Sequence, residues 1–399
     1  MSGVSFKANK ISPSLTLKLA AKATKLKAEG KNIDSFTAGE PDFNTPNFII
    51  EAAKTAMDKG FTRYTATSGI LPLREAICKK LKLDNNLDYT PNQIVVSNGA
   101  KHSLSNALLA IINSGDEVLI PSPYWLTYPE LVTLCDGNPK IIDLKTDTKF
   151  KLTPDILKDA IAPKTKAIIL NNPSNPSGIV YSKDELQALC AVVEKAGIFV
   201  ISDEIYEKLI YDDIEFYSVA QFSEKLKNKT IVINGLSKAY AMTGWRIGYS
   251  ASSIEIAEAI ENIQSQMTSN ANSVAQHASL AALTDHRGEV FLKELKQTFK
   301  ARRDLICKLL DDIKTLTYIR PNGAFYVMVD ISLFLGKTIK GFKINSASDF
   351  SEFLVEKAGL VTIPLESFGA SNFIRLSYCL GEEEIKEGIE RLKGAINDK

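Results

Sequence analysis

The sequence has few of the residues from which metal centres and disulfide frameworks are built. Its five cysteines are scattered, and no two of them form a CxxC pair. Only three histidines occur, namely His102, His277 and His286, and none stands in a pattern of metal ligands or beside a nucleophile. We therefore expect no disulfide framework, no metal site and no Ser-His-Asp triad.

The sequence also lacks a long apolar run and an excess of charge of one sign. No run approaches the roughly 20 residues that a membrane-spanning helix needs. The 48 basic side chains almost balance the 47 acidic ones, for a net charge of +1. This balance gives no reason to expect binding to nucleic acid or to an anionic membrane surface. Residues 1–7 lack the apolar core of a secretion signal, so we expect a cytosolic protein.

Short apolar runs rich in β-branched residues alternate with helical patterns through the first two thirds of the chain. We expect strands at residues 94–96, 118–120, 167–170, 198–201 and 230–233. Strands separated in this way by helices predict an α/β fold with a mainly parallel sheet, covered by helices on both faces. Ligands of such sheets bind beyond the carboxyl ends of the strands.

The pattern changes after Asp285. A long amphipathic helix is followed by strands expected at residues 321–329, 360–363 and 373–378, with a polar loop at 336–345. These segments indicate a smaller α+β domain, and we expect the N-terminal helix, residues 15–28, to join it because chain ends often lie close together. The predicted division is a large cofactor-binding domain at 37–285 and a small domain at 1–36 and 286–399.

The strongest chemical signal follows the run Thr230–Ile233. This run stops at the turn Asn234-Gly235, and Lys238 and Arg246 come next. A poorly hydrated lysine can lose its proton and attack a carbonyl, and an arginine offers a planar fork to phosphate oxygens. An amine for an aldehyde and a fork for a phosphate together indicate a site for pyridoxal 5'-phosphate (PLP). Taken alone, the stretch also fits a surface turn with a solvated lysine.

Other polar residues at strand ends supply what PLP requires of a protein. Asp203 is suited to hold a proton on the pyridine nitrogen, although a helix N-cap is the alternative. Asn175 and Tyr206 can both reach the phenolic oxygen, but a proline-flanked asparagine is also an ordinary turn residue. The segment Gly99-Ala100-Lys101, at a helix start, presents free N–H groups to a phosphate.

Three further residues complete the candidate site. Trp125 is suited to stacking on the cofactor ring, with a core aromatic as the alternative. Arg375 lies in an alternating strand pattern, where it is either a solvent-facing residue of an edge strand or a bidentate clamp for a substrate α-carboxylate. A clamp would direct the substrate Cα–H bond towards Lys238 as general base. Gly39 lets a ligand approach the backbone, although its loop also fits a plain connector.

Five motifs occur in one order along nearly the whole chain. They are Ala38-Gly-Glu-Pro-Asp-Phe-x-Thr-Pro46, Asn172-Pro-x-Asn-Pro-x-Gly178, Ser202-Asp-Glu-Ile-Tyr206, Ser237-Lys-Ala-Tyr-Ala-Met-Thr-Gly-Trp-Arg-Ile-Gly248 and Arg375-Leu-Ser. In combination they resemble the class I/II aminotransferases, PLP enzymes of fold type I. The run Ala-Met-Thr-Gly-Trp-Arg-Ile-Gly-Tyr most resembles the bacterial aspartate aminotransferases of that family.

The resemblance implies a function and a role for each residue. It implies transfer of an amino group from aspartate to 2-oxoglutarate by a ping-pong mechanism, with Lys238 as the catalytic residue that forms an aldimine with PLP. It further implies that the cofactor contacts Gly99, Ala100, Lys101, Trp125, Asn175, Asp203, Tyr206, Ser237 and Arg246. Substrate would bind at Gly39, Trp125, Asn175 and Arg375. Enzymes that this chain resembles are homodimers, so Tyr64 and the segment Thr268-Ser269 would come from the neighbouring subunit.

Two departures from the family pattern leave the substrate open. Gly235 stands where many members have a phosphate-binding serine, which Ser237 would have to replace. A side-chain carboxylate needs a cation, yet residues 264–272 contain no arginine and Ser12 stands where some members have a lysine; Lys101 is the alternative. A transaminase for aromatic, prephenate-type or alanine substrates and a β-lyase therefore remain alternatives. A PLP-binding regulator would carry an added DNA-binding domain, for which the fewer than 40 residues before Gly39 are too few.

Overall fold

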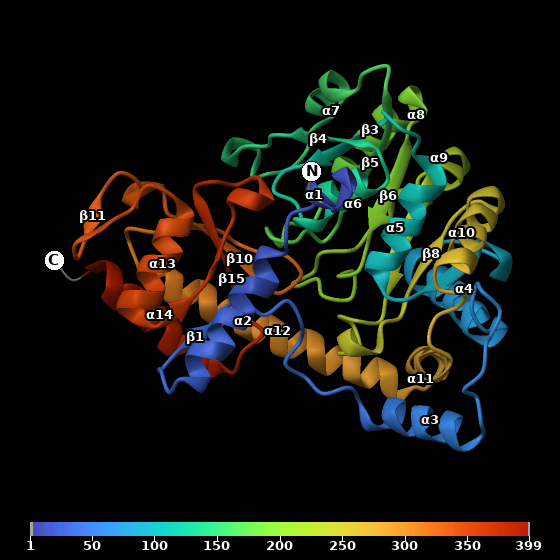
Figure 1. Ribbon diagram of the computed structural model, residues 1–399, viewed down its shortest axis with the longest axis horizontal. Helices are drawn as coiled ribbons and strands as arrows, with labels where there is room; N and C mark the ends of the chain where they lie inside the picture. The colour runs from blue at the N-terminus through green and yellow to red at the C-terminus, as the bar shows by residue number, and fades with distance from the viewer. Residues whose placement is uncertain (1–2, 398–399) are drawn as a thin grey trace.

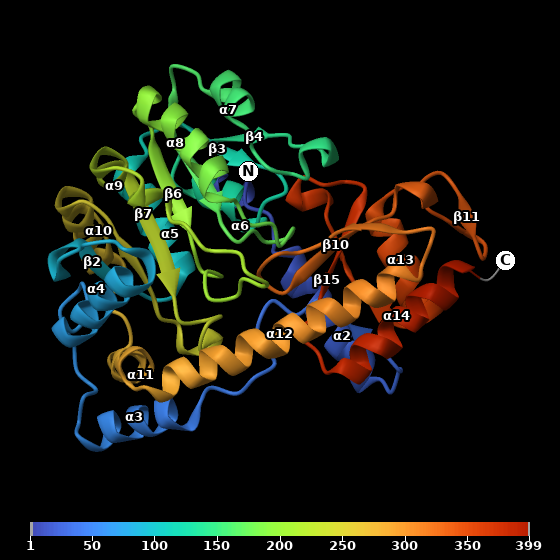
Figure 2. The ribbon, with the colours of Figure 1, turned by 180° about the vertical axis from the view of Figure 1, so that it is seen from behind.

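The computed structural model describes residues 3–397. Figure 1 shows two parts side by side, a larger one built around the strands β2 to β8 and a smaller one around β10 and β15. The long helix α12 (Arg287–Asp311) runs along both parts, as Figure 2 shows from behind. No helix of residues 3–397 has the length and the apolar character that crossing a membrane demands.

The larger part contains, within residues 3–397, a sheet of seven strands in the order β2-β8-β7-β6-β5-β3-β4. These strands are β2 (Ile94–Ser97), β3 (Glu117–Pro121), β4 (Asn138–Ile142), β5 (Thr165–Asn171), β6 (Phe199–Asp203), β7 (Thr230–Gly235) and β8 (Gly248–Ala251). Strands β3 to β7 pair in parallel, whereas β8 runs antiparallel to β7 and β2. The predicted parallel sheet is confirmed; β4 and β8 are additions to it.

Helices cover both faces of this sheet because successive side chains of a strand point to opposite faces. On β5, Ala167 and Ile169 share a core with α5 (Ala100–Ile111), α6 (Thr127–Leu134) and α10 (Ile254–Met267). Ile168 and Leu170 instead share a core with α8 (Lys183–Ala196), α7 (Pro154–Ala160) and α9 (Glu224–Lys229). A third core joins β2, β7 and β8 to α3 (Asn47–Asp58), α4 (Leu71–Asn85) and α11 (Ser273–Thr284).

The smaller part is built on an antiparallel sheet of β14 (Ile363–Pro364), β15 (Phe373–Ser377), β10 (Tyr326–Asp330) and β9 (Thr317–Ile319). Its core includes residues of α12, α13 (Ala347–Ala358) and α14 (Glu382–Asn397). The short strand β1 (Asp34–Ser35) pairs in parallel with β13 (Leu360–Val361), which brings the segment that follows α2 (Leu15–Ala28) to the C-terminal elements. The helix α1 (Phe6–Asn9) instead lies against the larger part (Figure 1), where Lys7 forms an ion pair with Asp136. The predicted α+β part is thus present, and the domain limits at residues 36/37 and 285/286 remain a prediction.

The smaller part differs from the prediction in three details. The expected strand 360–363 is divided at Thr362, because β13 pairs with β1 whereas β14 pairs with β15 in the other sheet. The expected strand 321–329 begins only at Tyr326, because Ala324 has a positive φ of 55°. The expected loop 336–345 contains a hairpin of β11 (Thr338–Ile339) and β12 (Phe342–Lys343).

Candidate active site

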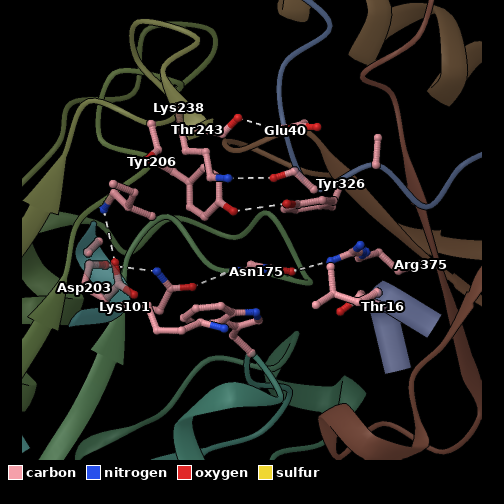
Figure 3. A pocket seen from close by; sticks show the side chains of 18 of the residues that line it. Thr16, Glu40, Lys101, Asn175, Asp203, Tyr206, Lys238, Thr243, Tyr326 and Arg375 are labelled. Atoms are coloured by element: carbon pink, nitrogen blue, oxygen red, sulfur yellow. Dashed lines mark hydrogen bonds between the residues drawn. The ribbon is translucent and has the colours of Figure 1, made fainter. Parts of the chain in front are cut away.

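A cavity of about 440 Å³ lies where the carboxyl ends of β5, β6 and β7 face the smaller part. Asn171 and Asp203 end β5 and β6, and Lys238 follows β7 by three residues. Arg375 and Tyr326 enter from strands β15 and β10 of the smaller sheet, and Thr16 enters from α2. Figure 3 shows the side chains of Asp203, Lys238, Tyr326, Arg375 and Thr16 around a common space. Both parts of the fold therefore contribute to one site.

The loop from β7 to β8 carries Lys238, and glycines at its two ends permit the tight return. Gly235 and Gly248 pair across the two strands. A Cβ on Gly248 would lie 2.2 Å from the backbone nitrogen of Ala100, so a side chain there has no space. The Lys238 Nζ donates a hydrogen bond of 2.6 Å to the carbonyl oxygen of Gly39. The end of the loop therefore packs against the start of α5, and the lysine amine is held at Gly39.

The Lys238 amine has the properties of a base. The pKa of the amine is lowered to about 8, mainly by burial, with the nearby guanidinium groups of Arg246 and Arg375 acting in the same direction. Cys379 and Glu40 act in the opposite direction. At neutral pH, a lysine with this pKa has a far larger fraction of neutral amine than a solvated lysine. The surface-turn interpretation of the stretch is therefore wrong.

Asp203 is a buried carboxylate with two donors. The Tyr128 hydroxyl donates to its Oδ2 at 2.7 Å, and the Ile205 N–H donates to its Oδ1 at 3.3 Å. Burial raises the pKa of the Asp203 carboxyl to about 6, and these donors together with Lys238 limit the rise. The N-cap alternative is wrong, because Asp203 is followed by turns and not by a helix, and the next helix of the described residues is the short one at Val219–Gln221. The carboxylate instead faces the cavity, where a cationic partner would stabilise it.

Arg375 is buried although it carries a charge, with 1% of its surface exposed. Its strand β15 lies between β14 and β10, so the edge-strand alternative is wrong. Its guanidinium donates to Asn175 Oδ1 at 3.0 Å and to the carbonyl oxygen of Thr37 at 3.2 Å, and lies 4.2 Å from the centre of the Tyr326 ring. Its Nε has no hydrogen-bond partner, and no carboxylate of residues 3–397 forms an ion pair with it. A buried arginine in this condition is suited to bind an anionic ligand.

The start of α5 and Arg246 form the third polar region of the cavity. Gly99 has a φ of +89°, and a Cβ there would lie 2.4 Å from an Arg246 guanidinium nitrogen, so glycine permits their close approach. The first N–H groups of α5 have no partner within the helix. Beside them, the Lys101 Nζ lies 4.8 Å from the centre of the Trp125 ring. An exposed guanidinium next to a helix N-terminus is suited to bind a phosphate.

Comparison with known proteins identifies the family. The family model described as aminotransferase class I and II matches residues 31–392. The chain belongs to this family. It is 43% identical to an aspartate aminotransferase of Bacillus sp. (strain YM-2), with 96% of each chain covered, and 43% identical to a probable aspartate/prephenate aminotransferase of Aquifex aeolicus, with 99% of each covered. The structure of aspartate aminotransferase from Thermus thermophilus with maleate matches with a TM-score of 0.93 and 36% identity, over 99% of this chain and 100% of that one.

The protein is a PLP-dependent aminotransferase, as its family membership establishes. The residues around the cavity fit this cofactor. They include an amine of lowered pKa at Lys238, a buried carboxylate at Asp203 and an anion site at Gly99 and Arg246. Burial and the nearby Tyr326 raise the pKa of the Tyr206 hydroxyl well above its ordinary value, so Tyr206 is a neutral donor.

The structure brings together nearly all of the residues that the sequence indicated. Those that line the cavity are Gly39, Ala100, Lys101, Trp125, Asn175, Asp203, Tyr206, Ser237, Lys238, Arg246 and Arg375. Gly99 lies directly behind Arg246. Gly235 does not line the cavity, whereas Ser237 does. Tyr64 is 87% exposed and lies outside the cavity of its own chain.

Sequence reasoning missed several cavity residues. Tyr326 stands in an apolar run, where a tyrosine is interpreted as a core residue, and Tyr128 stands at the start of a helix with no sequence signal to mark it. Glu40 and Thr243 stand inside two of the recognised motifs. Glu40 directly follows Gly39, and Thr243 precedes Arg246 by three residues. Their positions next to predicted site residues could have identified both as cavity residues.

Proposed function

We propose that the protein transfers the amino group of aspartate to 2-oxoglutarate and produces oxaloacetate and glutamate. One observation carries the proposal: the amine of Lys238 faces the same cavity as the buried guanidinium of Arg375, whose Nε has no hydrogen-bond partner among the described residues. The first is suited to amino-group chemistry and the second to an α-carboxylate. The relatives named aspartate aminotransferase support the choice of donor, and so does the maleate in the Thermus structure, because maleate is a four-carbon dicarboxylate.

Each residue of the cavity has a proposed task. Bound PLP supplies a ring that accepts the electrons left at the substrate Cα. Lys238 would hold PLP and serve as the base that takes the proton from the substrate Cα, for which a pKa near 8 is well matched. Asp203 would hold the ring nitrogen protonated, while Asn175 and Tyr206 would be the donors to the phenolic oxygen. Arg246, Ser237 and the segment Gly99-Ala100-Lys101 would hold the phosphate, and Trp125 would be the aromatic partner of the ring.

The substrate is held at both of its carboxylates. We assign the α-carboxylate to Arg375 and to the backbone at Gly39, with Asn175 and Trp125 beside it. The cations of the cavity are Lys101, Lys238, Arg246 and Arg375. Since three of these have other tasks, Lys101 is the cation left for the side-chain carboxylate, in addition to its place beside the phosphate. Ser12 has no such role, because its N–H donates to Glu130 at 3.1 Å and it does not line the cavity.

A second candidate is transamination of prephenate. The Aquifex relative, named a probable aspartate/prephenate aminotransferase, favours it. The two functions share the α-carboxylate site and differ in the group that Lys101 receives. A protein with both activities would use prephenate as amino acceptor with aspartate as donor.

Steady-state turnover with a panel of donors tests the proposal. Aspartate with 2-oxoglutarate should give the highest kcat/KM, compared with alanine, tyrosine and phenylalanine as donors and prephenate as acceptor. A β-lyase would release ammonia and pyruvate without a 2-oxo acid acceptor. Lys238→Ala should lose nearly all turnover and the absorption band of the lysine-bound cofactor; a variant that keeps both contradicts the role of Lys238.

We also propose a homodimer whose active site lies at the subunit interface. The exposed large apolar side chains include Met57, Phe61, Tyr64, Leu71 and Met267, and burial of such side chains by a second copy would stabilise a dimer. Tyr64 of one subunit would then reach the phosphate of the other. Light scattering tests the dimer, and mixing Lys238→Ala with Tyr64→Ala subunits should restore one competent site per mixed dimer. We propose a cytosolic location, which fits the five free cysteines of the described residues and can be checked by cell fractionation.

A further inference from the structure

The loop from Gly39 to Pro46 is fastened to the Lys238 loop at two places. At one, the Thr243 hydroxyl donates a hydrogen bond to the Glu40 carboxylate. At the other, the Thr45 hydroxyl donates to the carbonyl oxygen of Ala241 at 2.7 Å and accepts from the Trp245 indole at 3.0 Å. The first fastening lies inside the cavity, directly beside the Lys238 amine (Figure 3).

The Glu40–Thr243 bond lies between two parts of the site. Gly39, the neighbour of Glu40 in the chain, accepts the hydrogen bond of the Lys238 amine on its carbonyl oxygen. On the other side, the carbonyl oxygen of Thr243 accepts a bond of 2.7 Å from the Arg246 guanidinium. Thr243 therefore connects the loop that holds the lysine amine with the arginine at the helix start.

We propose that Glu40 is a positioning residue whose bond to Thr243 keeps the Gly39 carbonyl on the Lys238 amine, and that its negative charge favours the ammonium form of this amine. The inference rests on the proposed role of Lys238 as the base. When the amine leaves Gly39, the loop stays in place because the Thr243 and Thr45 bonds do not involve the lysine. The amine therefore has a fixed acceptor to which it can return.

Several charged and titratable groups face the amine, and Glu40 differs from the others in its position. Burial, Arg246 and Arg375 lower the pKa of Lys238, whereas Cys379 and Glu40 raise it. Asp203 lies on the sheet side and is itself affected by Lys238. Tyr206, Tyr326 and Lys101 also line the cavity. Among these groups, Glu40 is the carboxylate on the loop side, so it can be neutralised without disturbing the residues assigned to the cofactor.

Four single variants of the full-length, PLP-free protein test the inference. Glu40→Gln keeps an acceptor for Thr243 and removes the charge. Thr243→Val removes the bond and keeps the charge, and Thr243→Ser restores the bond. Glu390→Gln is the matched control, an exposed carboxylate on α14 outside the cavity. The readouts are the pH midpoint of Lys238 reductive methylation, followed by peptide mass spectrometry, and hydrogen exchange of residues 39–44.

We expect the methylation midpoint near pH 8 in the unmodified protein. Glu40→Gln should lower this midpoint by about 0.5 to 1 pH unit, with exchange of the loop nearly unchanged. Thr243→Val should accelerate loop exchange by about threefold or more. Thr243→Ser should restore slow exchange of the loop, and Glu390→Gln should alter neither readout.

Two results would overturn the inference. One is a Glu40→Gln midpoint that equals that of Glu390→Gln, and the other is a Thr243→Val loop that exchanges as slowly as the unmodified loop. Since Glu40 is exposed, its substitution leaves the core intact, and the Thr243 pair decides the question separately. Both readouts are made without PLP or substrate. A protein that passes them and fails to transaminate aspartate would refute the proposed function and leave the role of Glu40 standing.

Discussion

Removal of the Arg375 guanidinium should abolish most of the activity, by an amount that the structure allows us to work out. Of the five N–H donors of an arginine, two are used here, by Asn175 and Thr37. A carboxylate can therefore still receive two charge-assisted bonds, worth about 1.5–3 kcal/mol each. Arg375→Met loses both, or about 3–6 kcal/mol, and its kcat/KM for aspartate and for 2-oxoglutarate should fall by about 10²- to 10⁴-fold.

Arg375→Lys distinguishes the contribution of the positive charge from that of the two parallel hydrogen bonds. A lysine keeps the positive charge and can make one of the two bonds, so its loss should be about half of that free energy, roughly 10- to 100-fold. The assay is steady-state kinetics with both substrates, with the absorption band of the bound cofactor as a check of the site. Arg303→Lys is the control, because Arg303 is also buried but pairs with Asp212 and Asp304 outside the cavity. An Arg375→Met variant within tenfold of the unmodified enzyme would refute the reasoning.

Three other substitutions address the remainder of the site. Gly99→Ala should weaken PLP binding by about tenfold, since its Cβ would displace the Arg246 guanidinium; equilibrium dialysis gives the affinity, and an unchanged value contradicts the phosphate site. Tyr128→Phe removes a donor that lowers the pKa of Asp203. That pKa should therefore rise, and the acidic limb of the kcat/KM profile should move to higher pH by about 0.5 to 1 unit. A shift to lower pH would contradict the effect assigned to Tyr128. Lys101→Ala should raise KM for aspartate by about tenfold and leave KM for alanine unchanged; equal effects on both substrates, with weaker PLP binding, would assign Lys101 to the phosphate alone.

The sequence predicted the sheet side of the site well, for a physical reason. Asp203 and Lys238 follow apolar runs, and neighbouring parallel strands end at the same edge. The two side chains therefore meet because of a local sequence pattern, an apolar strand followed by a polar residue. The lowered pKa of Lys238 is not local in this sense, because it depends on burial beneath the smaller part and on Arg375, far along the chain.

The contribution of the smaller sheet was harder to predict. Alternation along residues 373–377 gives the face of Arg375 but not whether its strand lies at an edge, since that depends on the partners on either side. In the structure both partners are present, and the charge is buried. The division of one predicted strand into two at Thr362 was equally hard to predict. No feature of residues 360–363 indicates that the chain passes from one sheet to another there.

The bond between Arg375 and Asn175 has a consequence for specificity. It joins the proposed α-carboxylate clamp to a residue that the cofactor would also contact, so the direction of the guanidinium is set by the protein's own contacts. A clamp fixed in this way orients every α-amino acid alike relative to the ring, which is the preorganisation that a shared reaction step requires. It cannot select aspartate, because all α-amino acids present the same α-carboxylate. Selection must therefore come from a cation elsewhere in the cavity, and Lys101, which stands over the Trp125 ring, is in a position to provide it.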